Sequence, residues 1–95
     1  MSMKEAYEKK LQAKLDEWNA EIDKLKAKAD SAEADVQLEY YKQIEELRSM
    51  QDAARKKLVE LKAAGDDAWE DLKAGTDSAW DSLSRSIKSA VSRFS

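Results

Sequence analysis

The side chains that could do chemistry gather in the last third of the chain. Six serines follow one another closely, and four carboxylates open the same segment. The chain has no histidine and no cysteine, so a serine nucleophile lacks its commonest general base and a soft metal lacks its usual ligands. Four carboxylates on about one helical turn cannot encircle a hard cation. We therefore expect no catalytic residue, no cofactor and no metal site among Ser82, Ser84, Ser86, Ser89, Ser92, Ser95, Asp66, Asp67, Glu70 and Asp71.

Tryptophan is the other residue type with functional potential, and two of the three lie in a repeat. Residues 68–78 read AWEDLKAGTDS and residues 79–89 read AWDSLSRSIKS, so Ala, Trp and Leu recur at the same places. Tryptophans at the edge of an apolar stripe favour packing against protein, with the indole N–H near solvent. The alternative is that Trp69 and Trp80 anchor an amphipathic helix at a membrane surface.

The eleven-residue spacing continues backwards along the chain. Apolar side chains stand eleven apart from residue 25 to residue 91, and a second series runs from residue 50 to residue 94. Eleven residues fill about three helical turns, so such a series stays on one face of a nearly straight helix. The first series is Leu25, Val36, Leu47, Leu58, Trp69, Trp80 and Val91, and the second is Met50, Leu61, Leu72, Leu83 and Phe94.

The first third of the chain alternates apolar steps of four and three from Leu11 to Val36, the heptad pattern of a coiled coil. Together the patterns predict one apolar stripe that forms the core or an interface. Its residues are Leu11, Leu15, Trp18, Ile22, Leu25, Val36, Tyr40, Ile44, Leu47, Leu58, Leu61, Trp69, Leu72, Trp80, Leu83, Ile87, Val91 and Phe94.

The helices that must carry this stripe lie in one all-α domain, residues 1–95. The chain contains no proline and two glycines, Gly65 and Gly75. We expect a helix over residues 3–63, a turn or kink over 64–67 at Gly65, and a helix over 67–94, folded as a hairpin. The alternative is a three-helix bundle with a further turn within residues 27–35, where no large apolar side chain occurs.

The hairpin would require a second chain. A helix of about 60 residues is about 90 Å long, so the shorter helix would cover only part of it. Leu11, Leu15, Trp18 and Ile22 would then face water, and burying each such side chain is worth about 1.5–3 kcal/mol. We therefore expect self-association as a homo-oligomer, with another protein as a further candidate partner. The bundle makes no such demand.

Charge and hydropathy narrow the classes of protein to which the chain could belong. The net charge is −3, with no continuous basic face, which disfavours nucleic-acid binding. No apolar run is long enough to span a bilayer, and MSMKEAYEKK lacks the apolar stretch of a secretory signal, so we expect a cytoplasmic protein. These features favour a non-enzymatic coiled-coil structural or protein-interaction protein. The alternative is reversible membrane-surface binding through the C-terminal amphipathic helix.

The segment YYKQIEELRSMQDAARKKLVELKAAGDDAWEDLKAG, the second AWDSL and the final SAVSRF resemble a family of short bacterial coiled-coil stress-response proteins with a cyanobacterial namesake. The opening EAYEKKLQAKLDEWNAEIDKLKAKAD is similar to the same family, so the resemblance covers nearly the whole chain. It implies a cytoplasmic helical protein made under oxidative or light stress. It implies no catalytic residue, cofactor or ligand.

Overall fold

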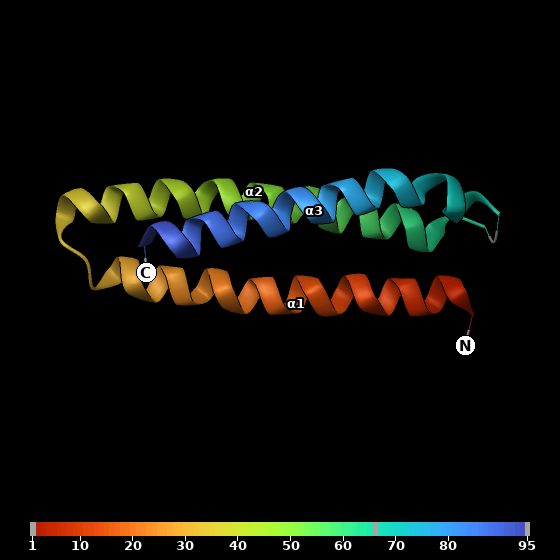
Figure 1. The fold of residues 1–95 in the computed structure, drawn as a ribbon, viewed down its shortest axis with the longest axis horizontal. Helices are drawn as coiled ribbons and strands as arrows, with labels where there is room; N and C mark the ends of the chain where they lie inside the picture. Colours follow the sequence, from red (N-terminus) through yellow and green to blue (C-terminus); the bar gives the residue numbers. More distant parts are fainter. Residues whose placement is uncertain (1, 66, 95) are drawn as a thin grey trace.

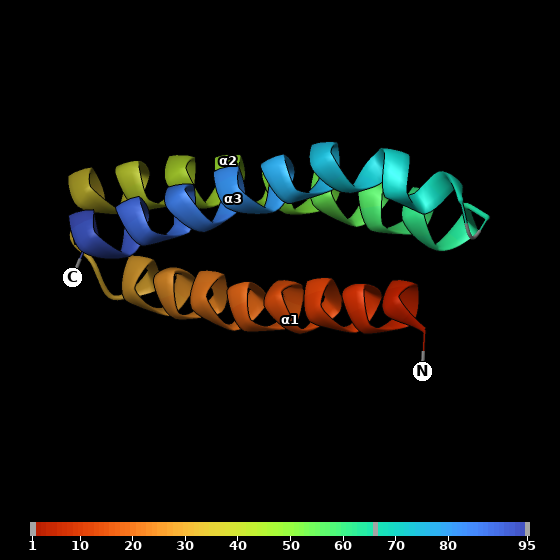
Figure 2. The same ribbon diagram turned by 45° about the vertical axis from the view of Figure 1, so that its right-hand side comes forward.

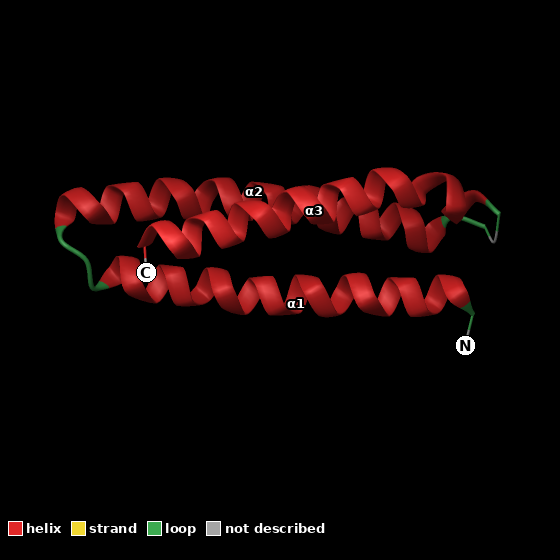
Figure 3. Ribbon diagram, viewed as in Figure 1, coloured by secondary structure: helices red, strands yellow, loops and turns green. Residues whose placement is uncertain are grey.

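Three α-helices carry nearly all of the residues that the computed structural model describes, which are residues 2–65 and 67–94. Helix α1 spans Met3–Asp30, α2 spans Ala34–Ala63 and α3 spans Ala68–Phe94. α1 and α3 run in the same direction and α2 runs in the opposite one (Figure 1). The helices lie side by side in a rod of 51 × 20 × 18 Å (Figures 2 and 3). The architecture is an up-down-up three-helix bundle.

The expected single helix over residues 3–63 is wrong, because the chain turns between Asp30 and Ala34. The expected hairpin is therefore wrong as well, and the three-helix alternative describes the arrangement. Folding back at this point brings α2 onto the apolar face of α1. That face, which a hairpin would leave in water, is buried within one chain at Leu11, Leu15 and Ile22. The free energy gained by this burial explains why a segment of good helix formers breaks.

Side chains of α2 hold the first turn. The Gln37 side-chain amide donates to the Ala29 carbonyl at 3.0 Å, and the Tyr41 hydroxyl donates to the Asp30 carboxylate at 2.6 Å. The Ser31 backbone N–H donates to the Lys28 carbonyl at 3.2 Å. The bonds to Ala29 and Lys28 satisfy backbone carbonyls in the last turn of α1, and the bond to Asp30 ties the side chain of its last residue to α2. The turn consequently needs neither glycine nor proline.

The second turn lies at the expected place. α2 ends at Ala63, and its C-cap residue Ala64 is extended and donates back to Glu60 and Leu61. Gly65 does not have a positive φ, so the turn does not use the left-handed conformation for which glycine is usually selected. The Lys4 ammonium of α1 donates to the Ala64 carbonyl at 2.7 Å. Gly65 therefore marks a turn rather than a kink.

The buried face of every helix repeats with steps of four and three residues. In α2 the steps lead from Tyr40 to Leu61 and pass through Gln51 and Ala54, which are buried although they are not large apolar residues. In α3 the buried Thr76 and Ala90 fall seven residues either side of Leu83. Such steps are the heptad spacing of left-handed helix packing. The eleven-residue series coincide with these heptads only in part, as from Leu47 to Leu58 and from Trp69 to Trp80, because eleven is four plus three plus four.

Two residues of the expected stripe are exposed and lie outside the core of the bundle. Val36 is 45% exposed and Leu72 is 36% exposed. The turn resets the register, so Tyr40 rather than Val36 begins the buried face of α2. In α3 the buried face passes through Thr76 instead of Leu72, and the Thr76 hydroxyl donates to the Leu72 carbonyl at 2.8 Å. Val91 and Phe94 are half-buried. The buried members are Leu11, Leu15, Trp18, Ile22, Leu25, Tyr40, Ile44, Leu47, Leu58, Leu61, Trp69, Trp80, Leu83 and Ile87.

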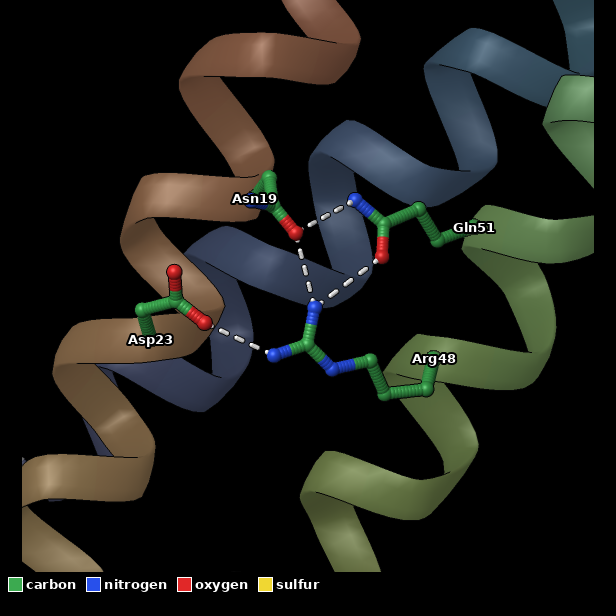
Figure 4. Close-up of polar contacts among 4 residues, drawn as sticks. All are labelled: Asn19, Asp23, Arg48 and Gln51. Carbon is green, nitrogen blue, oxygen red and sulfur yellow. Dashed lines mark hydrogen bonds and ion pairs between the residues drawn. The ribbon is translucent and has the colours of Figure 1, made fainter.

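A polar cluster joins α1 to α2 midway along the rod (Figure 4). The Arg48 guanidinium donates to Asn19 at 2.8 Å, to Asp23 at 2.8 Å and to Gln51 at 3.3 Å. The Gln51 amide nitrogen donates to Asn19 at 3.4 Å. Gln51 is 1% exposed, so these bonds replace the water that its amide loses on folding. The cluster fixes which residues of α1 and α2 stand opposite each other.

Candidate protein-interaction surface

The contact between α1 and α3 is the thinnest of the three helix interfaces, and an open groove runs along it. One hollow of about 330 Å³ lies between the first half of α1 and the middle of α3, and another of about 310 Å³ lies between the middle of α1 and the last third of α3. Trp18 and Ser84 line both hollows, so they are one continuous feature, which we name the α1/α3 groove. Small side chains on α3 such as Ser84 keep the groove open, because they leave space that a larger residue would fill.

Core side chains form the floor of the groove. Trp18 and Leu11 of α1 meet Trp80 and Ile87 of α3, and each of them shows only an edge to solvent. The Trp80 indole N–H donates to the Leu11 carbonyl at 3.2 Å, so the polar atom of this buried ring is satisfied across the interface. Val91 is half-buried and extends the apolar floor towards the end of α3. The floor offers apolar contact to a bound molecule without loosening the core.

Charged side chains form both rims of the groove, and their signs are ordered. On the α1 rim two lysines are followed by two glutamates, and on the α3 rim two aspartates are followed by Lys88, with Arg85 on its outer side. α1 and α3 are parallel (Figure 1), and the hollows place the basic half of one rim opposite the acidic half of the other. The α1 rim is Lys10, Lys14, Glu17 and Glu21, and the α3 rim is Asp77, Asp81 and Lys88.

Tyr7 closes the groove at its first end. Its hydroxyl donates to the Asp77 carboxylate and lies 3.4 Å from the Lys73 carbonyl oxygen. The Lys73 ammonium lies 5.5 Å from the centre of the Tyr7 ring, and the Trp69 ring centre lies 5.8 Å from it. Burial, the hydrogen bond to Asp77 and the charge of Asp77, in that order, raise the pKa of Tyr7 far above its ordinary value. Tyr7 is therefore a neutral hydrogen-bond donor rather than an acid–base group.

The other two faces of the rod offer less to a partner. The polar cluster around Arg48 fills the seam between α1 and α2. The hollow between α2 and α3 has a polar lining that includes Glu39, Lys42 and Arg93, where Arg93 and Glu39 form an ion pair at 3.5 Å. The apolar floor and the ordered rims thus occur together at the α1/α3 groove.

The structure separates the residues whose types first suggested chemistry. Ser84 lines the groove, whereas Ser89 is exposed beyond it, and no imidazole exists in the chain to activate either. Within residues 2–65 and 67–94, no group of acidic side chains is arranged to hold a metal ion. Asp66 of the carboxylate cluster lies outside the described residues. In the same part of the chain, none of the helices has the length and apolar character needed to cross a bilayer.

Sequence reasoning identified the floor of the groove but missed its rims and the polar cluster. In the sequence the rim residues look like ordinary charged residues on a helix surface. Their opposite signs are seen to face each other only once α1 and α3 are known to be parallel. No protein-family model, curated protein or solved structure matches this chain.

Proposed function

We propose that this chain is a non-enzymatic helical interaction module that binds another protein surface through the α1/α3 groove. The observation that carries the proposal is the coincidence of an apolar floor, at Trp18, Ile87 and Val91, with two rims of ordered charge. Protein interfaces combine such an apolar centre with a polar border. A shallow groove lined by lysines, carboxylates and serines supports recognition of a surface better than catalysis on a small substrate.

The test uses a photo-crosslinking amino acid in the full-length chain, expressed in living cells. Ser84 is the position of choice because it lines both hollows and is half-buried in the groove. Ser49, an exposed serine on α2, is the matched control. Illumination is expected to join the chain at position 84 to a protein, either a second copy or another chain, and to give little product at position 49. Equal or absent products at the two positions would contradict the proposal.

The competing proposal is reversible binding to a membrane surface. It is favoured by Arg85, Lys88 and Arg93, which are exposed near the half-buried Val91 and Phe94 at the end of α3. It has a cost, because Trp69 and Trp80 are buried and would reach lipid only if α3 left the bundle. Flotation with vesicles containing anionic lipid distinguishes the two. We expect the protein to stay in the aqueous fraction, and quantitative flotation would favour the membrane proposal.

A protective role under stress extends the interaction proposal. It is supported by the resemblance of YYKQIEELRSMQ and of the paired AW-x-x-L segments to stress-response proteins. The proposal predicts that cells contain more of this protein after oxidative or light stress. Quantitative mass spectrometry of stressed and unstressed cells measures this directly. An unchanged amount would leave the interaction module without a stress role.

A further inference from the structure

The charges along the α1/α3 groove form four quarters of alternating sign. Lys10 and Lys14 make the first half of the α1 rim positive, and Asp77 and Asp81 make the facing half of the α3 rim negative. Beyond Ser84 the signs exchange. The α1 rim becomes negative at Glu17 and Glu21, and the α3 rim becomes positive at Lys88, with Arg85 beside it on the outer side of α3.

A surface with this pattern complements itself. Two identical faces that meet about a two-fold axis lying in the interface bring each quarter onto a quarter of the partner. If the axis runs along the helices, Lys10 and Lys14 meet Asp77 and Asp81 of the second copy. If the axis runs across the helices, the same lysines meet Glu17 and Glu21 of the second copy. Both arrangements place opposite charges together at all four quarters, whereas a face of one sign would repel its copy.

The groove also offers enough area for such a contact. An interface of ordinary size takes about 800 Å² from each partner. That is roughly an eighth of the 6233 Å² that the chain exposes, which one long face of a three-sided rod can supply. The floor residues Trp18, Ile87 and Val91 lie between the rims and would form the centre of the contact.

We propose that a second copy of this chain occupies the α1/α3 groove and forms a two-fold symmetric dimer. The inference rests on the proposed function and names the partner of the same surface. The sequence suggested self-association for a different reason, namely that a hairpin would expose Leu11, Leu15, Trp18 and Ile22. Those side chains are buried within one chain, so the present inference does not rest on their exposure. The Lys14–Glu17 ion pair within one rim, at 3.5 Å, is exposed and weak enough to be exchanged for contacts with the second copy.

Sedimentation equilibrium of the full chain tests the dimer and the role of charge together. We expect a mass of twice 10.8 kDa at micromolar concentration. Lys10→Glu with Lys14→Glu is expected to raise the dissociation constant at least about tenfold, because like charges then meet in either arrangement. Lys56→Glu with Lys57→Glu on the exposed face of α2 makes the same change in net charge and should leave the dimer intact. Circular dichroism of each variant checks that the helices form.

Mixing variants identifies the axis. The Lys10→Glu, Lys14→Glu chain should dimerise with a Glu17→Lys, Glu21→Lys chain if the axis runs across the helices. It should instead dimerise with an Asp81→Lys chain if the axis runs along them. Ser84→Arg, which places a bulky cation at the middle of the groove, should prevent association in both cases without altering the charged quarters.

Three results would overturn the dimer. They are a monomer mass at every concentration up to the millimolar range, a dimer that tolerates both the rim reversal and Ser84→Arg, and failure of both mixtures to associate. None of these three results by itself contradicts the proposed function as an interaction module. Crosslinks from position 84 to a different protein would preserve that function while excluding a second copy as the partner.

Discussion

Tyr7 couples the stability of the bundle to pH. Its pKa is raised in the folded chain from the ordinary value of 10.0, which the unfolded chain retains. Above that value the unfolded chain loses the phenolic proton while the folded chain keeps it, so the unfolded state is favoured as pH rises. The stabilisation from Tyr7 is thus complete below pH 10 and is lost progressively above it.

Urea unfolding at a series of pH values between 8 and 11 checks this. The free energy of unfolding should fall with pH more steeply in the natural chain than in Tyr7→Phe, which has no phenol to titrate at this place. Tyr41, whose pKa is also raised through its hydrogen bond to Asp30, remains in both proteins and so cancels in the comparison. Parallel pH curves for the two proteins would show that Tyr7 is not held by Asp77 in solution.

The polar cluster predicts unequal costs for two neighbouring truncations on α1. Asn19→Ala removes the acceptor of the buried Gln51 amide, and leaving such a donor unsatisfied costs about 1–3 kcal/mol. Asp23→Ala breaks an ion pair with Arg48 in which the carboxylate is 59% exposed and the guanidinium side chain 38% exposed, a loss of about 1 kcal/mol or less. Denaturant unfolding of the two variants measures the difference. Equal costs would mean that Gln51 finds another partner.

At the scale of single residues, the sequence predicts large apolar core members and little else. Leu47 and Leu83 carry a clear signal, because they are apolar on every reading of the period. Gln51 and Thr76 carry none, since polar side chains are usually exposed and only the packed structure supplies their partners. Val36 shows the opposite case, in which an apolar residue next to a turn continues the sequence pattern but does not reach the core.

Gly75 offers a test of a single helix. It lies within α3, is exposed and has nothing within 4 Å of the place where a side chain would begin. Glycine in a helix interior is less favourable than alanine by about 0.5–1 kcal/mol, so Gly75→Ala should raise the free energy of unfolding by that amount. Ala74→Gly at the adjacent exposed position should lower it by a similar amount. Thermal unfolding followed by circular dichroism measures both, and a loss of stability in Gly75→Ala would indicate an unseen contact.

At the scale of elements, the sequence predicts where helices occur better than where they stop. The α2–α3 turn has a glycine followed by two aspartates, and its position is confirmed. The α1–α2 turn has no comparable local signal, because Gln37 and Tyr41 supply the capping bonds from the next helix. Counting heptad steps through Gln51 and Ala54, instead of tracing apolar residues at eleven, would have predicted the buried faces correctly.

The whole molecule should unfold as one unit because its three helices share one core. Leu47 of α2 is fully buried, and Leu47→Ala should lower the free energy of unfolding by about 2–5 kcal/mol. The tryptophans lie in α1 and α3, so their fluorescence should report the same loss as circular dichroism. Val59→Ala on the exposed side of α2 should change stability by less than about 0.5 kcal/mol. Separate transitions for the two probes would mean that α2 unfolds on its own.

The odd number of helices has a consequence for anything attached to the chain. The chain starts near one end of the 51 Å rod and α3 finishes towards the opposite end, so the beginning of α1 and the end of α3 point away from each other (Figure 1). Two domains fused to the two ends of the chain would be held apart by the length of the bundle between them. Copies linked in tandem would therefore follow one another along the rod direction. In a two-helix hairpin, by contrast, both termini would lie at the same end.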